Sequence, residues 1–167
     1  MQIREALPAQ ADTLTQLIFA SKRYWGYADE DMARWASGLT ISSAYIEKNM
    51  TALAEENGEI LGIVSLLEEP PEKVFCIEEH RVTGGFFLDF LFVRPDYIRR
   101  GIGRQLASHA LDWCGQKNID KLYVISDPNA KGFYERLGAV CLGSLTDPPN
   151  SGTGRVRPFL VFRLNGG

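Results

Sequence analysis

The stretch that decides the fold begins with Phe86-Phe87-Leu88-Asp89-Phe90-Leu91-Phe92-Val93 and continues to Tyr97-Ile98-Arg99-Arg100-Gly101-Ile102-Gly103-Arg104. Its first eight residues are apolar except for Asp89, and this run predicts a strand buried on both faces. From Ile102 onward the apolar residues recur with a helical period, at Ile102, Leu106, Ala107, Ala110, Leu111 and Cys114. The stretch therefore predicts a strand, a glycine-containing turn and a helix.

The turn before this helix contains no residue of the kinds that commonly cap helices. Between Tyr97 and Gln105 there is no Ser, Thr, Asn or Asp to accept hydrogen bonds from the first helical N–H groups. Two glycines, which let a ligand approach the backbone, and three arginines stand there instead. Free N–H donors flanked by cations suit a phosphate or pyrophosphate. The alternative is a plain glycine turn capped by water, and the turn by itself favours neither.

The spacing of the glycines excludes the better-known phosphate loops, because neither the Gly-Lys-Ser/Thr ending of a P-loop nor a G-x-G-x-x-G pattern is present. The stretch instead resembles the acetyl-CoA signature of the GCN5-related N-acetyltransferase (GNAT) family, written Q/R-x-x-G-x-G/A after an apolar strand end. Gly101 and Gly103 match its glycines, and residues 91–93 match the strand end. Ile98 departs from the signature, since the family usually has Gln or Arg there; the two arginines that follow are candidates for the missing polar contact.

A second stretch resembles the same family. Residues 127–138 read Asp-Pro-Asn-Ala-Lys-Gly-Phe-Tyr-Glu-Arg-Leu-Gly, which matches the family's later motif of an Asn near a helix start followed by Phe-Tyr-Glu-x-Leu-Gly. From the residues alone, Asp127 is a good helix cap, Pro128 suits the first helical position and Gly138 is a stop signal. Both motifs stand in the family's order and spacing, and the resemblance covers nearly the whole chain. Residues 21–27 and 154–158 resemble one bacterial subgroup.

The rest of the chain predicts an α/β protein with a mixed sheet and helices on both faces. Asn57-Gly58 is a strong hairpin signal, and Gly62 is a candidate for a bulge. The family resemblance implies a mostly antiparallel sheet in which a central parallel pair of strands splays apart. We expect further strands at residues 2–6, 51–56, 59–67, 122–125, 139–145 and 159–164, further helices at 9–24 and 29–37, loops at 68–73 and 146–154, an ambiguous segment at 74–82, and a lead into the sheet at 46–50.

Length and composition suit one globular domain. The chain has 167 residues, of which 45% are hydrophobic and 23% charged, and neither a repeat nor a linker divides it. We therefore expect a single N-acetyltransferase domain over residues 1–167. The net charge of −3 argues against a general nucleic-acid binder. The sequence has no apolar run of membrane-spanning length and no signal pattern, so we expect a cytoplasmic protein that does not bind membranes.

The cysteines and histidines predict neither a metal site nor a disulfide. Three cysteines lie far apart, no C-x-x-C occurs, and the two histidines make no ligand cluster with them. A covalent cysteine mechanism also has no support, because no cysteine is paired with a recognisable His/Asp set. Cys114 lies on the apolar face of the predicted helix, which favours a packing role.

The family resemblance implies that acetyl-CoA is the co-substrate and assigns it contacts. The pantetheine arm is expected along the strand end, at Leu91, Phe92 and Val93, and Asn129 is expected to contact the arm. Tyr134 stands where the family has the acid that protonates the departing thiolate, but it also fits a core stripe with Phe133 and Leu137. The pyrophosphate is expected on the backbone of Arg99, Arg100, Gly101, Ile102, Gly103 and Arg104.

Acetylation of an amine also needs a base, because an alkylammonium has a pKa near ~10 and must lose a proton before it attacks. Asp89 is the best candidate. It is the only charge in the apolar strand, and buried carboxylates are rare unless they are paired or functional. A structural role, in which Asp89 pairs with an arginine or caps a neighbouring backbone group, has equal weight. The other candidates for the base are Glu78, Glu79 and His80.

We therefore expect an acetyl-CoA-dependent N-acetyltransferase that acts on a primary amine of a small molecule or peptide by direct attack in a ternary complex. The rival is a non-catalytic CoA-binding or sensor domain that kept the fold, and Ile98 in the signature is the feature that favours it. The expected partners are acetyl-CoA and an amine acceptor. Homodimers are common in the family, which makes a homodimer a further expectation.

Overall fold

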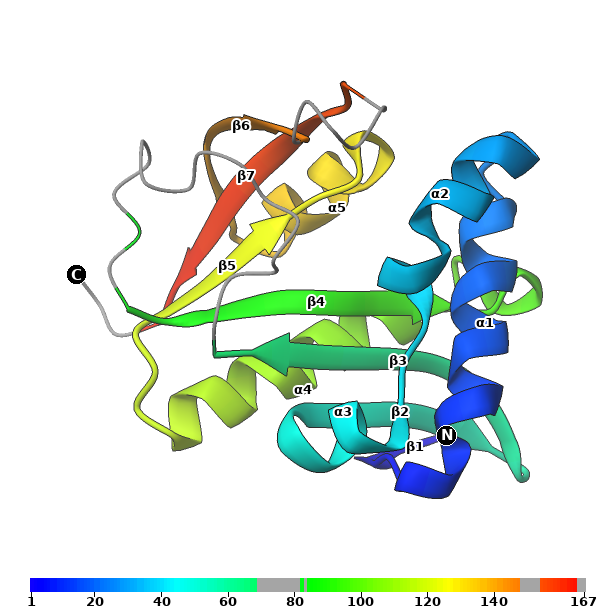
Figure 1. Cartoon of the computed structure of the whole chain (residues 1–167). Coiled ribbons are helices and arrows are strands. Elements are labelled where there is room, and N and C mark those ends of the chain that lie inside the picture. Colours follow the sequence, from blue (N-terminus) through cyan, green and yellow to red (C-terminus); the bar gives the residue numbers. More distant parts are fainter. Residues whose placement is uncertain (69–81, 83, 148–153, 165–167) are drawn as a thin grey trace. The chain divides into compact units, whose positions relative to one another are not determined.

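The computed structural model of the chain describes residues 1–68, 82, 84–147 and 154–164 (Figure 1). Three predictions fall wholly or largely outside these residues: the loop at 68–73, the ambiguous segment at 74–82 and the long loop at 146–154. The alternative bases Glu78, Glu79 and His80 also lie outside the described residues.

The described strands form a seven-stranded sheet in the order β1-β2-β3-β4-β5-β7-β6. Strands β4 and β5 are parallel, whereas β1 with β2, β2 with β3, β5 with β7 and β6 with β7 pair antiparallel. This confirms the predicted mixed, mostly antiparallel sheet. The strands are β1 Gln2–Glu5, β2 Met50–Glu56, β3 Glu59–Leu67, β4 Phe86–Val93, β5 Lys121–Ile125, β6 Val140–Thr146 and β7 Val156–Arg163.

The predicted helices are present, and the structure adds one that the sequence analysis missed. The short helix α3 begins after Ser42, whose hydroxyl accepts a hydrogen bond from the Tyr45 N–H at 3.1 Å. We expected residues 46–50 to lead directly into the sheet, which was wrong because a six-residue helix is too short to show a period. The helices are α1 Ala11–Arg23, α2 Asp29–Leu39, α3 Ser43–Lys48, α4 Ile102–Gln116 and α5 Lys131–Arg136, with 3₁₀ turns η1 Pro8–Gln10, η3 Pro95–Tyr97 and η4 Pro128–Ala130.

The chain divides into two compact units, of which the first contains residues 1–66 and 90–110 and the second contains residues 67–89 and 111–167. All three boundaries fall inside regular elements, because β3, β4 and α4 each continue from one unit into the other. The prediction of a single domain over residues 1–167 stays a prediction.

In the first unit, helices cover both faces of the strands. One face carries an apolar core in which buried residues of α1, α2 and α3 pack with Leu53, Ile63 and Phe90. On the other face, a Cβ added at Gly62 would lie 2.8 Å from Leu106 Cδ1 of α4 and 2.8 Å from the Phe92 carbonyl oxygen. Because side chains alternate along a strand, α4 packs opposite α1 and α2.

The hairpin between β2 and β3 has the predicted turn and bulge. Asn57 and Gly58 have φ of 52° and 81°, the left-handed values that a type I′ turn requires. The register pairs Ala54 with Gly62 but Glu55 with Ile60, which leaves an extra residue, Leu61, on β3. The bulge predicted at Gly62 therefore occurs beside it.

In the second unit, β5 lies between the first part of β4 and β7. The register with β4 joins residues 86–88 to residues 122–124, and β4 continues beyond this register to Val93. Three aromatic rings stack through the core of this unit. The ring centroids of Phe87 and Tyr123 are 5.3 Å apart, and those of Tyr123 and Phe159 are 5.6 Å apart.

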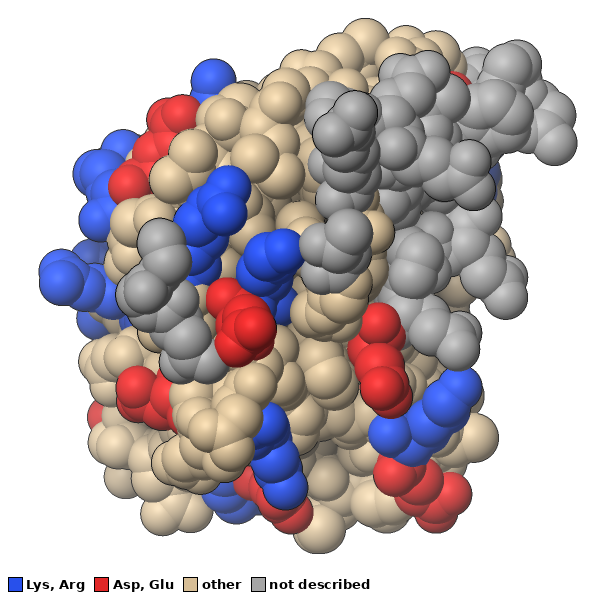
Figure 2. Space-filling view, turned by 90° about the vertical axis from the view of Figure 1, so that its left-hand side faces the viewer, with Lys and Arg blue, Asp and Glu red and all other residues tan. Residues whose placement is uncertain are grey.

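Charged side chains of both signs are mixed on the face drawn in Figure 2. On this face, Lys and Arg side chains lie between Asp and Glu side chains, and uncharged residues separate many of them (Figure 2). Among the described residues, no helix combines the length and apolar character needed to cross a membrane.

The close approach at Gly62 yields the first prediction. Gly62→Ala forces the new methyl group against the Phe92 carbonyl, which is backbone and cannot rotate away, so the free energy of unfolding should fall by about 1–3 kcal/mol. Gly115→Ala in α4 is the control, because nothing lies within 4 Å of its added Cβ, and it should be neutral or slightly stabilising. Urea unfolding measures both; equal stability of the two variants would contradict the packing at Gly62.

Candidate active site

The first part of the candidate site is the turn between β4 and α4. At its start, the Arg94 N–H donates to the Leu61 carbonyl of the β3 bulge at 2.8 Å, which ties the end of β4 to the bulge. Arg99 and Gly101 have positive φ, 68° and 79°, so the backbone turns sharply before α4. Gly101 supplies the carbonyl for the first helical hydrogen bond, from the Gln105 N–H at 3.1 Å.

This geometry leaves donors at the helix N-terminus. Because the first helical bond starts at Gln105, the N–H groups of residues 102–104 have no acceptor within α4. Gly103 is half-buried, whereas Arg99, Arg100 and Arg104 are exposed around it. The turn thus has the free N–H donors and flanking arginines that the sequence predicts for a pyrophosphate site.

A side-chain cluster that the sequence analysis did not find holds the same turn. The Tyr97 hydroxyl donates to Glu59 Oε2 at 2.6 Å, and the Arg94 guanidinium forms an ion pair with the same carboxylate. The hydrogen bond from Tyr97, together with the nearby charge of Arg94, lowers the pKa of Glu59. The Arg100 guanidinium lies 4.9 Å from the centroid of the Tyr97 ring. Glu59 is distant in sequence, so no local pattern could have indicated it.

The residues predicted to line the pantetheine arm occupy the end of β4. Leu91, Phe92 and Val93 are half-buried there. Asp89 on the same strand is also half-buried, and it interacts with another group of the protein. Its surroundings therefore fit both interpretations of the sequence, a base and a structurally paired carboxylate.

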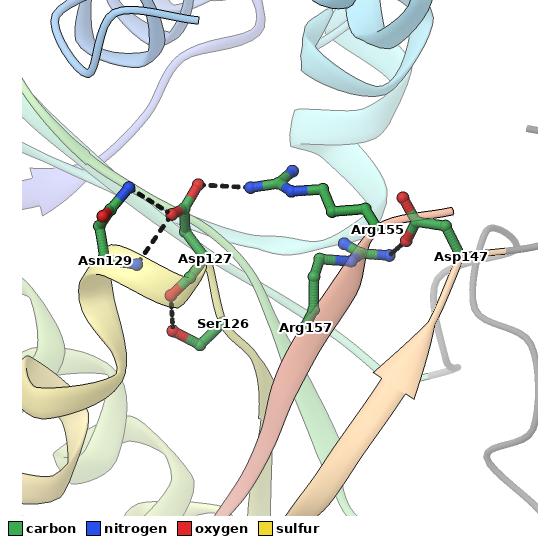
Figure 3. Close-up of polar contacts among 6 residues, drawn as sticks. All are labelled: Ser126, Asp127, Asn129, Asp147, Arg155 and Arg157. Carbon is green, nitrogen blue, oxygen red and sulfur yellow. Dashed lines mark hydrogen bonds and ion pairs between the residues drawn. The ribbon is translucent and has the colours of Figure 1, made fainter. Parts of the chain in front are cut away.

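A separate group of predicted site residues lies within the second unit, where β5 runs into η4 (Figure 3). Asp127 caps η4 as predicted: its Oδ1 accepts from the Asn129 N–H at 3.0 Å and from Asn129 Nδ2 at 3.1 Å. The Ser126 N–H donates to the Pro158 carbonyl of β7 at 2.9 Å, which anchors the cap to the sheet. The side chain of Asn129 is thereby oriented by the carboxylate that caps its own backbone.

Two arginines near the start of β7 form ion pairs in this region (Figure 3). Arg155 Nη2 lies 2.6 Å from Asp127 Oδ2, and Arg157 Nη2 lies 2.6 Å from Asp147 Oδ1 at the end of β6. In the sequence this segment is distinguished only by its resemblance to a subgroup of the family. Its ion-pair partners could not be predicted, because Asp127 and Arg155 are 28 residues apart in the chain.

Tyr134 lies on α5 and is 6% exposed. Its ring packs edge-on against Phe133, with centroids 5.1 Å apart. Burial, with a further contribution from the negative charge of Asp127, raises the pKa of Tyr134 well above its ordinary value. The phenol is therefore protonated at neutral pH, which is the form that a general acid needs. Its burial also agrees with the core stripe, so both roles predicted from the sequence fit its position.

Among the described residues, neither Cys114 nor a cluster of metal-ligating side chains adds a further candidate for catalysis. Cys114 is fully buried in α4, and burial raises the pKa of its thiol to about 11, so it is neutral at physiological pH. This agrees with its predicted packing role. Within the described parts of the chain, no group of three or more His, Cys, Asp or Glu residues is placed to hold a metal ion.

Comparison with known proteins decides the family. The model of the acetyltransferase (GNAT) family matches residues 13–139, which is more than half of the chain and includes both motifs. The chain belongs to this family. The predicted family is thus confirmed, and with it the enzyme class, an N-acetyltransferase with acetyl-CoA as co-substrate.

Named relatives and solved structures agree with this assignment. Over 139 residues the chain is 29% identical to the peptidyl-lysine N-acetyltransferase YiaC of Escherichia coli, covering 81% of each protein. A GCN5-related N-acetyltransferase from Rhodopseudomonas palustris has the same fold, with a TM-score of 0.75 and 23% identity over 98% of this chain and 95% of that one. The PaiA N-acetyltransferase of Thermoplasma acidophilum, solved with coenzyme A, has a TM-score of 0.71 and 16% identity over 97% and 98%.

Proposed function

We propose that this GNAT enzyme transfers the acetyl group of acetyl-CoA to a primary amine of a small molecule or peptide by direct attack in a ternary complex. The observation that carries the proposal is the N-terminus of α4, where the amides of residues 102–104 have no helical acceptor and three exposed arginines surround them. A fixed set of N–H donors in a positive field suits the pyrophosphate of the donor.

The side chains of Glu59, Tyr97, Arg94 and Arg100, which hold the turn before α4, support this role for the helix N-terminus. Glu59 holds Tyr97 and Arg94, and Arg100 lies over the Tyr97 ring, so the turn is braced by side chains even though Ile98 replaces the usual polar residue. In this proposal Arg100 and Arg99 take over the polar contact that the family signature assigns to position 98. The end of β4, at Leu91, Phe92 and Val93, offers its backbone to the pantetheine amides.

Proton transfer is assigned to two residues. The acceptor nitrogen attacks the thioester carbonyl, the C–N bond forms, and the C–S bond then breaks. Asp89 takes the proton that the ammonium must lose before it attacks, and Tyr134 gives its proton to the leaving sulfur. The nitrogen loses its second proton as the C–S bond breaks, and this proton restores the Tyr134 phenol. Asn129 is proposed to bind the pantetheine arm. The side chain of Asn129 is already oriented by Asp127, which lowers the entropy cost of that contact.

The acceptor to test first is a lysine side chain in a peptide. The relative YiaC is named a peptidyl-lysine N-acetyltransferase, and this suggests the acceptor class for the present chain. The assay incubates the enzyme with acetyl-CoA and a panel of lysine peptides and small amines, follows free thiol, and identifies the acetylated product by mass. Binding of acetyl-CoA without thiol release for any amine would instead support the non-catalytic CoA-binding domain.

Gly103→Glu tests the pyrophosphate site. The new side chain blocks the approach to the helix N-terminus and places a negative charge beside the phosphates, so the affinity for acetyl-CoA should fall at least about 100-fold. The fold should persist, because a carboxylate in the first turn suits the helix dipole. Ser108→Glu, an exposed position of the same helix, is the control and should bind normally. Calorimetry measures both variants; unchanged affinity in folded Gly103→Glu would place the anion site elsewhere.

Tyr134→Phe tests the acid. The ring and its packing remain while the hydroxyl is lost, so we expect near-normal stability and a fall in kcat of roughly 10- to 1,000-fold. Tyr123→Phe removes the hydroxyl of another buried tyrosine in the same unit and should leave kcat unchanged. Normal turnover in Tyr134→Phe with the best amine would mean that Tyr134 is a core residue only.

Asp89→Asn separates the two interpretations of this carboxylate. If Asp89 is the base, kcat should fall most at low pH, while the melting temperature and acetyl-CoA affinity change little. If Asp89 is the structural partner of an arginine, the variant leaves that charge uncompensated, which costs on the order of 3–5 kcal/mol and lowers the melting temperature strongly. A thermal melt and a pH–rate profile decide between them. A stable variant with wild-type pH dependence would contradict both and direct attention to Glu78, Glu79 and His80.

A further inference from the structure

The carboxylate of Asp127 serves a structural purpose but carries a charge that the reaction does not favour. One oxygen, Oδ1, caps η4 and orients Asn129 through two hydrogen bonds. The negative charge of the same side chain acts on Tyr134, whose buried hydroxyl it makes a weaker proton donor. An uncompensated carboxylate at this place would oppose both the loss of the Tyr134 proton and the negative charge that grows on the leaving sulfur.

Arg155 supplies the compensating charge. Its Nη2 lies 2.6 Å from Asp127 Oδ2, the oxygen that the cap does not use (Figure 3). The two side chains are 17% and 19% exposed, so solvent screens the pair less than it would screen one on the open surface. The Asp147 N–H also donates to the Arg155 carbonyl at 2.8 Å, which fixes the backbone from which the guanidinium extends.

We propose that Arg155 is a positioning residue for acetyl transfer, which offsets the charge of Asp127 so that this carboxylate can hold Asn129 with less opposition to proton donation by Tyr134. The inference rests on the proposed function, because it gives Tyr134 the role of the acid. It assigns a task to a residue that lies far from both family motifs in the chain.

A second ion pair in the same region serves as a control, because it has a structural role but no part in the cap of η4. Arg157 and Asp147 are also 2.6 Å apart, and they join β7 to β6. This pair does not involve the cap of η4. Breaking it should cost stability without a specific effect on the chemical step, so Arg157→Met is the matched control for Arg155→Met.

The experiment measures the single-turnover rate of acetyl transfer at saturating acetyl-CoA and amine, below the melting temperature of each variant. Arg155→Met should lower the rate by roughly 3- to 10-fold, because a weaker acid donates its proton to the leaving sulfur less readily. Arg155→Lys keeps the charge and should retain most of the rate. Adding Asp127→Asn to Arg155→Met should restore the rate, because the amide oxygen can still cap η4 and the negative charge is gone.

A purely structural role gives the opposite result for the double variant. Asp127→Asn would then add to the damage, and a double variant slower than Arg155→Met overturns the proposal. Equal rates for Arg155→Met and Arg157→Met overturn it as well. If Arg155→Met does not fold, Arg155→Gln takes its place with the same expected loss and the same expected rescue.

The failure of this inference can be told apart from the failure of the proposed function. Normal turnover in Tyr134→Phe would remove the acid and the inference with it. A slow Tyr134→Phe together with a normal Arg155→Met would reject the inference alone. In the Tyr134→Phe background, Arg155→Met should cause little further loss, because it acts through a hydroxyl that is no longer present.

Discussion

The amides at the start of α4 have no acceptor inside the helix, and much of the first unit holds them in place. The bulge on β3 supplies the Leu61 carbonyl that fixes Arg94, and Glu59 binds Tyr97 and Arg94 on the other side of the turn. Gly62 allows α4 to approach the strands closely. In the proposed function these contacts matter because N–H donors stabilise an anion best when they need no reorganisation to meet it.

Arginines neutralise the carboxylates that brace both parts of the candidate site. Glu59 is paired with Arg94, and Asp127 is paired with Arg155. Each carboxylate also accepts hydrogen bonds that position a neighbouring group, Tyr97 in one case and Asn129 in the other. In the proposed function each pairing keeps the structural benefit of the acid and lowers its net negative charge, which suits a donor that is itself negatively charged.

The regular elements could be predicted from the sequence where several signals coincide. The apolar run predicted β4 at its observed bounds, and the glycine turn and helical period predicted α4. The hairpin at Asn57-Gly58 and the cap at Asp127 were also confirmed, because both depend on adjacent residues. Helix α3 was missed for lack of length, and β7 begins three residues before the predicted start, since Pro158 falls within its first residues.

The family, the strand–turn–helix that carries the glycines, and the capped helix start that carries Asn129 and Tyr134 could all be predicted from the residues alone. These features are local, so backbone preferences and short patterns specify them. Which charges meet, in contrast, depends on how distant segments pack. The partners of Tyr97 and Asp127 come from segments 38 and 28 residues away, and β-strand pairing brings them together. No local rule encodes such distances, because register and bulges, rather than spacing along the chain, determine which side chains become neighbours.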